Sequence, residues 1–487
     1  MPKVPKGRTC DGYSHVQKLV VSQLTPEPLY LSSGPKFDDR SLAHSRRSFG
    51  FFLQQTCSQF SGFFTCVFWE THVPQAAHHE PIVLHAVVAL GSLHMTRGYC
   101  EENHDANRVF ALEQYNHAIR LLLDRGADRG TDVCLMACIL FTCFENMQGN
   151  HAGARAHIRS GAKLLYETLD DQTHRAYRHR IFGAKRYADC YSPLGAMARI
   201  FAALDSQTID TVRNHLLTPR SGKGKINGGD PFRIPTTFSN TEEAKAVFES
   251  GCWLLSHGDV GVLSDNDGDS TERSSYITLC NTRMAEFSNA LSNYTSLNSA
   301  HLTPKQDISL TLLRLQTLNT KIMFHLEVLP PPYQSRWETF MREMEEIVVL
   351  GEKVITYLLD SGCSSNRQAT TFCSGMGYVI PLWTVASHSR DPLICQKAIM
   401  LLRANSRQEG MWNSFQIADA AKRALEIVGG GVWDGQAGSI TDDKVNSYNL
   451  VSSPYLELDE KGGRLHYTRL GGGLGRYDHV VEEIFKF

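Results

Sequence analysis

The chain of 487 residues lacks the features that mark several large classes of protein. Its formal net charge is only −2, so the chain as a whole does not attract a polyanion, and its densest basic stretches are short. The longest apolar run is too short to cross a bilayer, and the polar, proline-rich start does not have the pattern of a signal peptide. We therefore expect no membrane association. The basic stretches are Lys3, Lys6 and Arg8 and residues 175–186, and the longest apolar run is 133–144.

Motifs for catalysis and cofactor binding are also missing. No Gly-x-Ser-x-Gly motif occurs, and no acid–base pair stands out. The GGGLG run at 471–475 follows no clear buried strand and opens no βαβ unit, so it favours a flexible C-terminal segment over a phosphate-binding loop. The sequence predicts no catalytic and no cofactor-binding residues, and we expect that the protein is not an enzyme.

The 13 cysteines form no disulfide framework. Cys134, Cys138 and Cys143 lie in an apolar run, which favours reduced, buried thiols in the cytosol or nucleus. Cys134 and Cys138 are one helical turn apart and could bind a metal with two further ligands. Because no basic group adjoins them to lower a thiol pKa, buried core cysteines are the better interpretation.

A histidine-rich stretch offers a second metal hypothesis. His78, His79, Glu80 and His85 include a His-Glu pair, as a metalloprotease helix does. The next histidine stands six positions after His79 rather than one helical turn on, so the two imidazoles face different directions. We expect a helix start here, with His85 and His94 used for packing or hydrogen bonds.

What the sequence has in abundance is helical patterning. Prolines make residues 1–40 extended or disordered, whereas residues 41–430 are helical almost throughout. Helices are predicted over residues 107–123, 131–147, 152–169 and 304–329, and others begin at Pro81, Pro193, Asn240, Trp337 and Pro392. Residues 431–487 form a Gly-rich, irregular tail in which 447–460 and 464–470 could be short strands. The predicted fold is all-α, an array of antiparallel helical hairpins with long surface loops and an irregular C-terminal tail.

Two groups of side chains invite functional interpretation. The aromatic side chains could dock a partner helix, but aromatics at helical spacing are mostly core residues. We expect most of this group to be core and leave a docking role open for Phe51 and Phe63. The ionic group is predicted to be an exposed network that fixes one helix–loop–helix junction and is no catalytic centre. The aromatic group is Phe49, Phe51, Phe52, Phe60, Phe63, Phe64, Phe68 and Trp69, and the ionic group is Arg390, Asp391, Arg403, Arg407 and Glu409.

The stretch 49–94 resembles a known family. Its aromatic-rich run ends in Phe68-Trp69, and an apolar helix follows Glu80-Pro81. This pattern is similar to the opening of the fungal-specific transcription factor domain, the helical regulatory region of binuclear zinc-cluster regulators. Further segments match the same domain in order: 114–123, 138–165, 200–207 with 234–244, and 378–383 with 389–414. The resemblance spans roughly residues 45–430. It implies a nuclear transcription regulator whose helical domain responds to a small effector or a partner protein.

The segment GRTCDGYS at 7–14 resembles the exit of the six-cysteine zinc cluster. Cys10 would be the final ligand, but the next cysteine is Cys57, inside the helical region. One thiolate cannot hold two zinc ions, so the chain as given should not form the cluster. Zinc, and DNA binding through it, are expected only if the native chain extends upstream. The alternative is a helical adaptor or scaffold that contacts protein partners or forms a homodimer, without DNA binding, and could modulate a full-length relative.

Overall fold

The computed structural model is predominantly helical, which confirms the predicted fold class. Within the described ranges, none of the helices is both long and apolar enough to span a lipid bilayer. Several predictions lie outside these ranges, namely those on residues 1–40 with Cys10, on 175–186 and on the GGGLG run. The structure describes residues 42–97, 104–124, 130–170, 193–209, 234–257, 270–327, 337–361, 370–375, 377–429, 455–458, 462–470 and 477–486.

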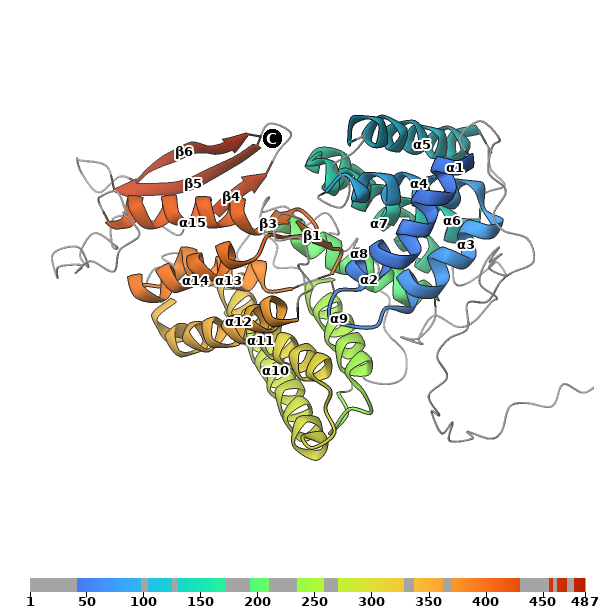
Figure 1. Cartoon of the computed structure of the whole chain (residues 1–487). Coiled ribbons are helices and arrows are strands. Elements are labelled where there is room, and N and C mark those ends of the chain that lie inside the picture. The colour runs from blue at the N-terminus through green and yellow to red at the C-terminus, as the bar shows by residue number, and fades with distance from the viewer. Residues whose placement is uncertain are drawn as a thin grey trace, which may run out of the picture.

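The first group of helices packs around one hydrophobic core. At its centre is α4, which is buried along almost its whole length because α1, α3, α5 and α6 pack against it. The chain then continues through α6, α7 and α8, each of which contacts the next, as helical hairpins do (Figure 1). The elements are α1 (Leu42–Phe51), η2 (Phe52–Thr56), α2 (Cys57–Ser61), η3 (Phe68–His72), α3 (Val73–His79), α4 (Pro81–Met95), α5 (His104–Asp124), α6 (Thr131–Gln148), α7 (His151–Asp170) and α8 (Pro193–Ile209).

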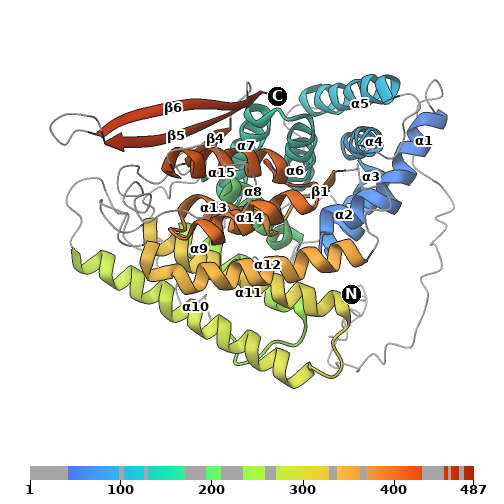
Figure 2. The ribbon, with the colours of Figure 1, turned by 60° about the vertical axis from the view of Figure 1, so that its left-hand side comes forward.

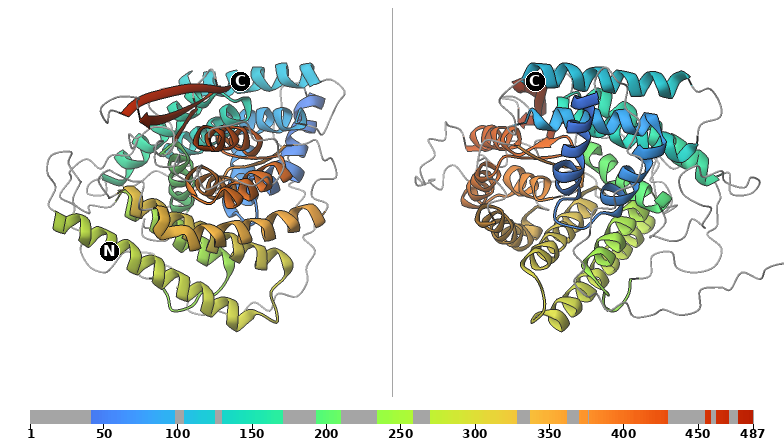
Figure 3. Two further views of the ribbon diagram at one scale, coloured as in Figure 1. Left: turned by 90° about the vertical axis from the view of Figure 1, so that its left-hand side faces the viewer. Right: turned by 45° about the vertical axis from the view of Figure 1, so that its right-hand side comes forward.

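The second group of elements surrounds another core. Helices α10, α11 and α12 follow one another side by side, and α13, α14 and α15 pack against each other above them (Figures 1 and 3). The elements are α9 (Thr241–His257), α10 (Ser270–Asn298), α11 (Pro304–Glu327), η4 (Trp337–Phe340), α12 (Met341–Asp360), β1 (Thr371–Cys373), α13 (Val379–His388), α14 (Pro392–Ala404), β2 (Arg407–Glu409), β3 (Trp412–Asn413), α15 (Ser414–Gly429), β4 (Tyr455–Leu458), β5 (Gly462–Leu470) and β6 (Tyr477–Lys486).

Three of the predicted helix starts show the capping bonds expected of them. Thr303 and Gln306 form a capping box, with Gln306 N donating to Thr303 Oγ1 at 3.3 Å and Thr303 N donating to Gln306 Oε1 at 3.0 Å. Asn240 accepts a hydrogen bond from the backbone of Glu243 at 2.7 Å, and Asp391 caps α14 through the Leu393 amide at 2.8 Å. Local sequence therefore sets where these helices begin.

The C-terminal tail is more regular than predicted. Its described residues form an antiparallel sheet in the order β4-β5-β6, which lies along α15 (Figure 2). The two strands expected from the sequence are present, with Leu456 opposite Leu465, and both side chains are buried in the second core. The third strand, β6, was not expected because its charged residues, such as Glu482 and Glu483, mask the alternating pattern.

A second small sheet, β1-β2-β3, lies among the helices. Strand β1 pairs in parallel with β2, and β2 pairs antiparallel with β3. The side chain of Phe372 in β1 belongs to the first core, whereas Trp412 in β3 belongs to the second. This sheet therefore lies where the two groups of helices meet.

Candidate functional site

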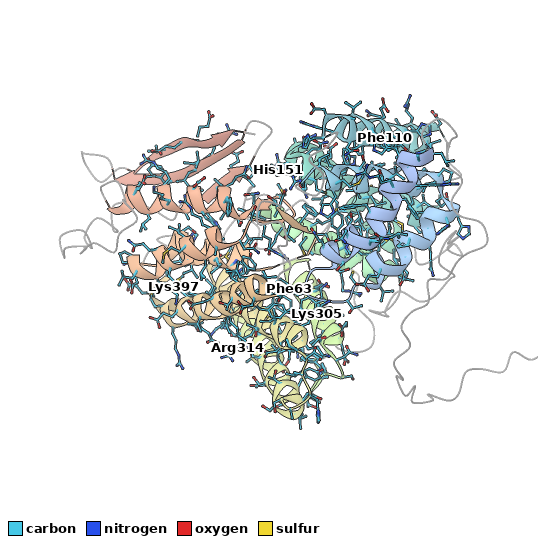
Figure 4. All side chains as sticks on the ribbon, viewed as in Figure 1. Phe63, Phe110, His151, Lys305, Arg314 and Lys397 are labelled. Atoms are coloured by element: carbon cyan, nitrogen blue, oxygen red, sulfur yellow. The ribbon has the colours of Figure 1, made fainter. Side chains whose placement is uncertain are left out.

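The two cores exchange side chains at their interface. Phe63 and Phe64 follow α2 in the first group, yet both are buried in the second core. Gly62 ends α2 with a positive φ of 66°, which glycine adopts without strain, and so turns the chain toward α11. There Ser309 Oγ donates a hydrogen bond to the Phe63 carbonyl at 2.7 Å. Figure 4 shows Phe63 in this central position.

A buried ion pair lies next to this turn. Arg407 Nε donates to Glu409 Oε1 at 2.7 Å, and their side chains are only 3% and 1% exposed. The carboxylate also accepts the backbone N–H groups of Tyr378 and Val379 at 3.1 and 3.0 Å, so it caps the N-terminus of α13. The prediction that Arg407 and Glu409 are exposed is therefore wrong. They lie in β2, whose pairing with β1 draws both side chains into the interior.

The guanidinium of Arg407 lies between two aromatic rings. Its carbon atom Cζ is 5.0 Å from the centroid of Phe63 and 5.6 Å from that of Tyr378. Burial opposes its charge, but the neighbouring Cys373 and Glu409 raise the pKa of Arg407 above its ordinary value. Arg407 therefore stays charged at the interface, and the ion pair joins β2 to both α13 and the turn after α2.

The remaining members of the predicted ionic group are on the surface. Arg390 pairs with Glu338, and Arg403 pairs with Asp419, and each of these pairs has partly exposed side chains. The predicted network is thus divided between two surface pairs and one buried pair. The buried pair lies between α14 and α15 in the sequence, but its side chains contact the start of α13 and the turn after α2.

The aromatic residues are mostly core, as predicted. Seven of the eight are buried, including Phe63, which lies beneath Arg407 and is not exposed to dock a partner. Phe51 is half-buried and makes an edge contact with the imidazole of His94. A docking role for Phe51 stays a prediction.

A second polar connection crosses the interface at Gln408. Its Oε1 accepts a hydrogen bond from Arg97 Nη1 at 2.6 Å, and its Nε2 donates to the Asn146 carbonyl at 2.7 Å. Arg97 also donates to the carbonyl of Met147. One side chain of β2 thereby joins the C-terminal ends of α4 and α6.

A cavity of about 420 Å³ opens beside this connection. From the first group it is lined by Arg97, Asn146 and His151, and from the second group by Thr370, Gln408 and Gln416. Figure 4 shows His151 on the side of α7 that faces the second group. Burial lowers the pKa of Arg97 to about 10, so its guanidinium is charged at neutral pH. We call this space the interface cavity.

The histidines have the packing role predicted for them. His85 Nδ1 contacts Gln114 Oε1 at 2.6 Å. The buried His94 contacts Thr56 Oγ1 at 2.8 Å and Gln59 Oε1 at 3.1 Å. Burial and the nearby Arg97 lower the pKa of His94 to about 3, so its imidazole is neutral.

Two of the three cysteines of the apolar run are core residues, whereas Cys134 is half-buried. Cys138 and Cys143 are buried, and burial raises the pKa of the Cys138 thiol to about 12. In the described part of the chain, no three His, Cys, Asp or Glu side chains gather as a metal site would require. The predicted zinc ligand Cys10 lies outside that part.

The residues of the interface cavity carry little sequence signal. The sequence predicts Arg407 and Glu409 to be exposed and gives Gln408 no role, because the strand partner of this segment, β1, lies far away in the sequence. Arg97 and Asn146 stand at the ends of helices that were predicted, but nothing local indicates that the two ends meet at Gln408.

Comparisons with known proteins bear on the whole chain. Residues 47–222 match the family model described as the fungal specific transcription factor domain. The aspercryptin biosynthesis cluster-specific transcription regulator atnN of Emericella nidulans is 23% identical over 511 residues, which cover 84% of this chain and 80% of that protein. No solved structure matches significantly. The chain therefore carries a fungal specific transcription factor domain and is a distant homologue of a fungal cluster-specific transcription regulator.

Proposed function

We propose that this protein is a nuclear transcription regulator that acts through its helical region and is not an enzyme. The observation that carries the proposal is the domain match over residues 47–222. The relative, whose printed name describes a regulator of the aspercryptin biosynthesis cluster, supports it because the likeness extends over 84% of this chain. We propose a biosynthesis cluster as the class of target of this protein as well.

The helical region is suited to relaying a signal by contact. Two cores share one interface, and polar side chains such as Arg407, Glu409 and Gln408 hold it together. A partner or effector that favours one arrangement of this interface would shift the population of the whole protein. We propose that the signal comes from a protein partner, a second copy of the chain, or a small effector.

Any reading of DNA would depend on a zinc cluster outside the described residues. Cys10 is the one candidate ligand in this chain, and it would need further cysteines upstream. Zinc is therefore part of the proposal only for a longer native chain. Without the cluster, the protein would work by contacting other proteins.

The test joins this chain to a heterologous DNA-binding domain and measures a reporter gene. We expect reporter output to change when the chain is tethered, and a fluorescent fusion to accumulate in nuclei. The Gly377→Ala variant, in which the interface is broken, should lose the effect, whereas Gly375→Ala should keep it. A Cβ at Gly377 would lie 1.7 Å from Glu409 Oε1, but one at Gly375 meets nothing within 4 Å.

The same experiment separates the alternative function. A helical adaptor would leave the reporter unchanged, would not need the nucleus, and would leave transcript levels unaltered when its gene is deleted. That outcome would replace the proposed regulator with a scaffold for protein contacts.

A further inference from the structure

The interface cavity contains the positive charge of Arg97, for which the described part of the chain provides no ion-pair partner. Arg97 follows the last turn of α4, and both of its hydrogen bonds go to neutral oxygens, Gln408 Oε1 and the Met147 carbonyl. Burial lowers the pKa of Arg97 to about 10. A guanidinium has five N–H donors, and these two bonds leave others for an added acceptor.

The floor of the cavity also contains an unsatisfied polar side chain. Asn146 is fully buried at 0% exposure, and neither its Nδ2 nor its Oδ1 has a hydrogen-bond partner among the described residues. Buried amides are normally paired, because an unpaired one costs about 1–3 kcal/mol. Asn146 and Arg97 both line the cavity, and the buried amide of Asn146 would pair with a ligand there after turning toward it.

The helix ends that border the cavity are of both signs, since α7 begins there and α6 ends there. The first turn of α7 borders the cavity at His151, and a helix N-terminus has a partial positive charge. The backbone carbonyls of Asn146 and Met147 at the end of α6, which would repel an anion, already accept hydrogen bonds from Gln408 and Arg97. The described residues that line the cavity include no acidic side chain.

We propose that the interface cavity binds a small organic molecule with a carboxylate group, which Arg97 holds. The inference rests on the proposed function, since this molecule would be the effector that the helical region senses. Arg97 and Asn146 belong to the first group of helices, whereas Gln408 and Gln416 belong to the second. A molecule that bridges them would stabilise one arrangement of the interface.

The chemistry of the lining selects this class of ligand. A single arginine complements one carboxylate better than a phosphate dianion, which usually meets several basic groups. The amides of Asn146, Gln408 and Gln416 supply both donors and acceptors, which suits the polar groups of an organic molecule. A volume of about 420 Å³ is within the usual range for small-molecule sites.

The first experiment measures thermal unfolding of the full chain with citrate, succinate and the neutral succinamide at millimolar concentration. Sodium chloride at equal ionic strength is the control for salt effects. We expect the two carboxylates to raise Tm, since a ligand of the native state stabilises it, and succinamide to have no effect. In Arg97→Gln the rise should disappear, because losing one charged hydrogen bond weakens binding about tenfold or more. In the surface variant Arg403→Gln the rise should remain.

A charge series at Gln416 keeps the test independent of how Arg97→Gln folds. Gln416 is half-buried at the cavity and belongs to α15. Gln416→Glu should weaken the binding of succinate and Gln416→Lys should strengthen it, as measured by calorimetric titration. Equal affinity in all three proteins, or a carboxylate effect that survives Arg97→Gln, would overturn the proposal.

The reporter assay separates this inference from the proposed function. If the tethered chain changes reporter output but no carboxylate binds, the regulatory function is supported and the carboxylate site is wrong. If carboxylates bind as expected but the reporter never responds, the carboxylate site is supported and the proposed regulatory function is wrong.

Discussion

At the scale of single residues, the most constrained group is the Glu409 carboxylate. It accepts hydrogen bonds from Arg407 and from two backbone N–H groups at the start of α13, and Glu409 is 1% exposed. Gly377 lies against it so closely that a Cβ atom would be 1.7 Å from Glu409 Oε1. The ion pair can therefore form in this position only because Gly377 has no side chain.

We predict that Gly377→Ala lowers the free energy of unfolding by about 3 kcal/mol or more, because it displaces a buried, paired charge. Gly375→Ala, two residues away with nothing within 4 Å of the added Cβ, is the matched control and should change stability by less than about 1 kcal/mol. Urea unfolding of both variants measures this. Equal midpoints would show that the carboxylate tolerates the extra methyl group.

A second prediction concerns pH and His94. Its pKa falls from 6.5 to about 3 on folding, through burial and the charge of Arg97. Between these values the unfolded chain binds a proton that the folded chain does not, so stability falls as pH drops through this window. From pH 7 to 5 the loss assigned to His94 is about 2 kcal/mol.

The measurement is urea unfolding at both pH values for the wild type and for His94→Gln. The variant should lose about 2 kcal/mol of the pH dependence, whatever its stability at pH 7. The exposed His301→Gln is the control. An unchanged pH dependence in His94→Gln would mean that other groups cause the acid sensitivity.

At the scale of elements, helix α4 lies very close to helix α1. A Cβ on Gly91 would lie 2.1 Å from the Ser48 carbonyl of α1, so glycine lets these two helices meet. Pro81 begins α4, where its missing N–H costs nothing, and apolar side chains then cover nearly every face. The helix is buried because it is apolar all round, and its packing distance depends on Gly91.

We predict that Gly91→Ala costs about 1–3 kcal/mol through overpacking of α1 against α4. Gly50→Ala in α1 is the contrasting change, since its added Cβ meets nothing within 4 Å. It should leave stability unchanged or raise it by about 0.5–1 kcal/mol, because alanine favours a helix. Thermal unfolding of both proteins should therefore shift in opposite directions, and parallel shifts would contradict the packing argument.

At the scale of the whole molecule, polar pairs join two apolar cores. Besides Arg407 and Gln408 at the interface, Glu249 of α9 lies 3.7 Å from Arg199 of α8, and Arg155 of α7 donates to the Leu458 carbonyl of β4 at 2.6 Å. These contacts tie the first group of helices to the second at several places. The two cores should therefore unfold together.

We predict that Arg407→Met lowers the free energy of unfolding by about 3–5 kcal/mol, because Glu409 is left buried without its cation. Asp419→Asn, which breaks the exposed pair with Arg403, should cost at most about 1 kcal/mol. Calorimetry should show one transition in the wild type and a lower or divided transition in Arg407→Met. Similar losses in both variants would mean that the buried pair does not couple the cores.

The helices could be predicted from the sequence because their signals are local. Pro81, the Thr303 and Gln306 box, and the Asp391 cap all act within one helical turn, and each one marks a helix start in the structure. The order of the matching segments is also visible in the sequence alone, and it indicates the family. Strand β6 was missed because the charged residues along it hide the alternation that marks a strand.

The interface and its cavity could not be predicted in this way. Arg97, Asn146 and Gln408 come from three distant segments, and their hydrogen bonds exist only after α4, α6 and β2 have packed together. For the same reason Arg407 and Glu409 looked like surface charges until β1 was placed beside β2. Helix ends depend on neighbours along the chain, whereas burial and the partners of polar groups depend on neighbours in space. Packing alone therefore determines where this protein can bind a ligand.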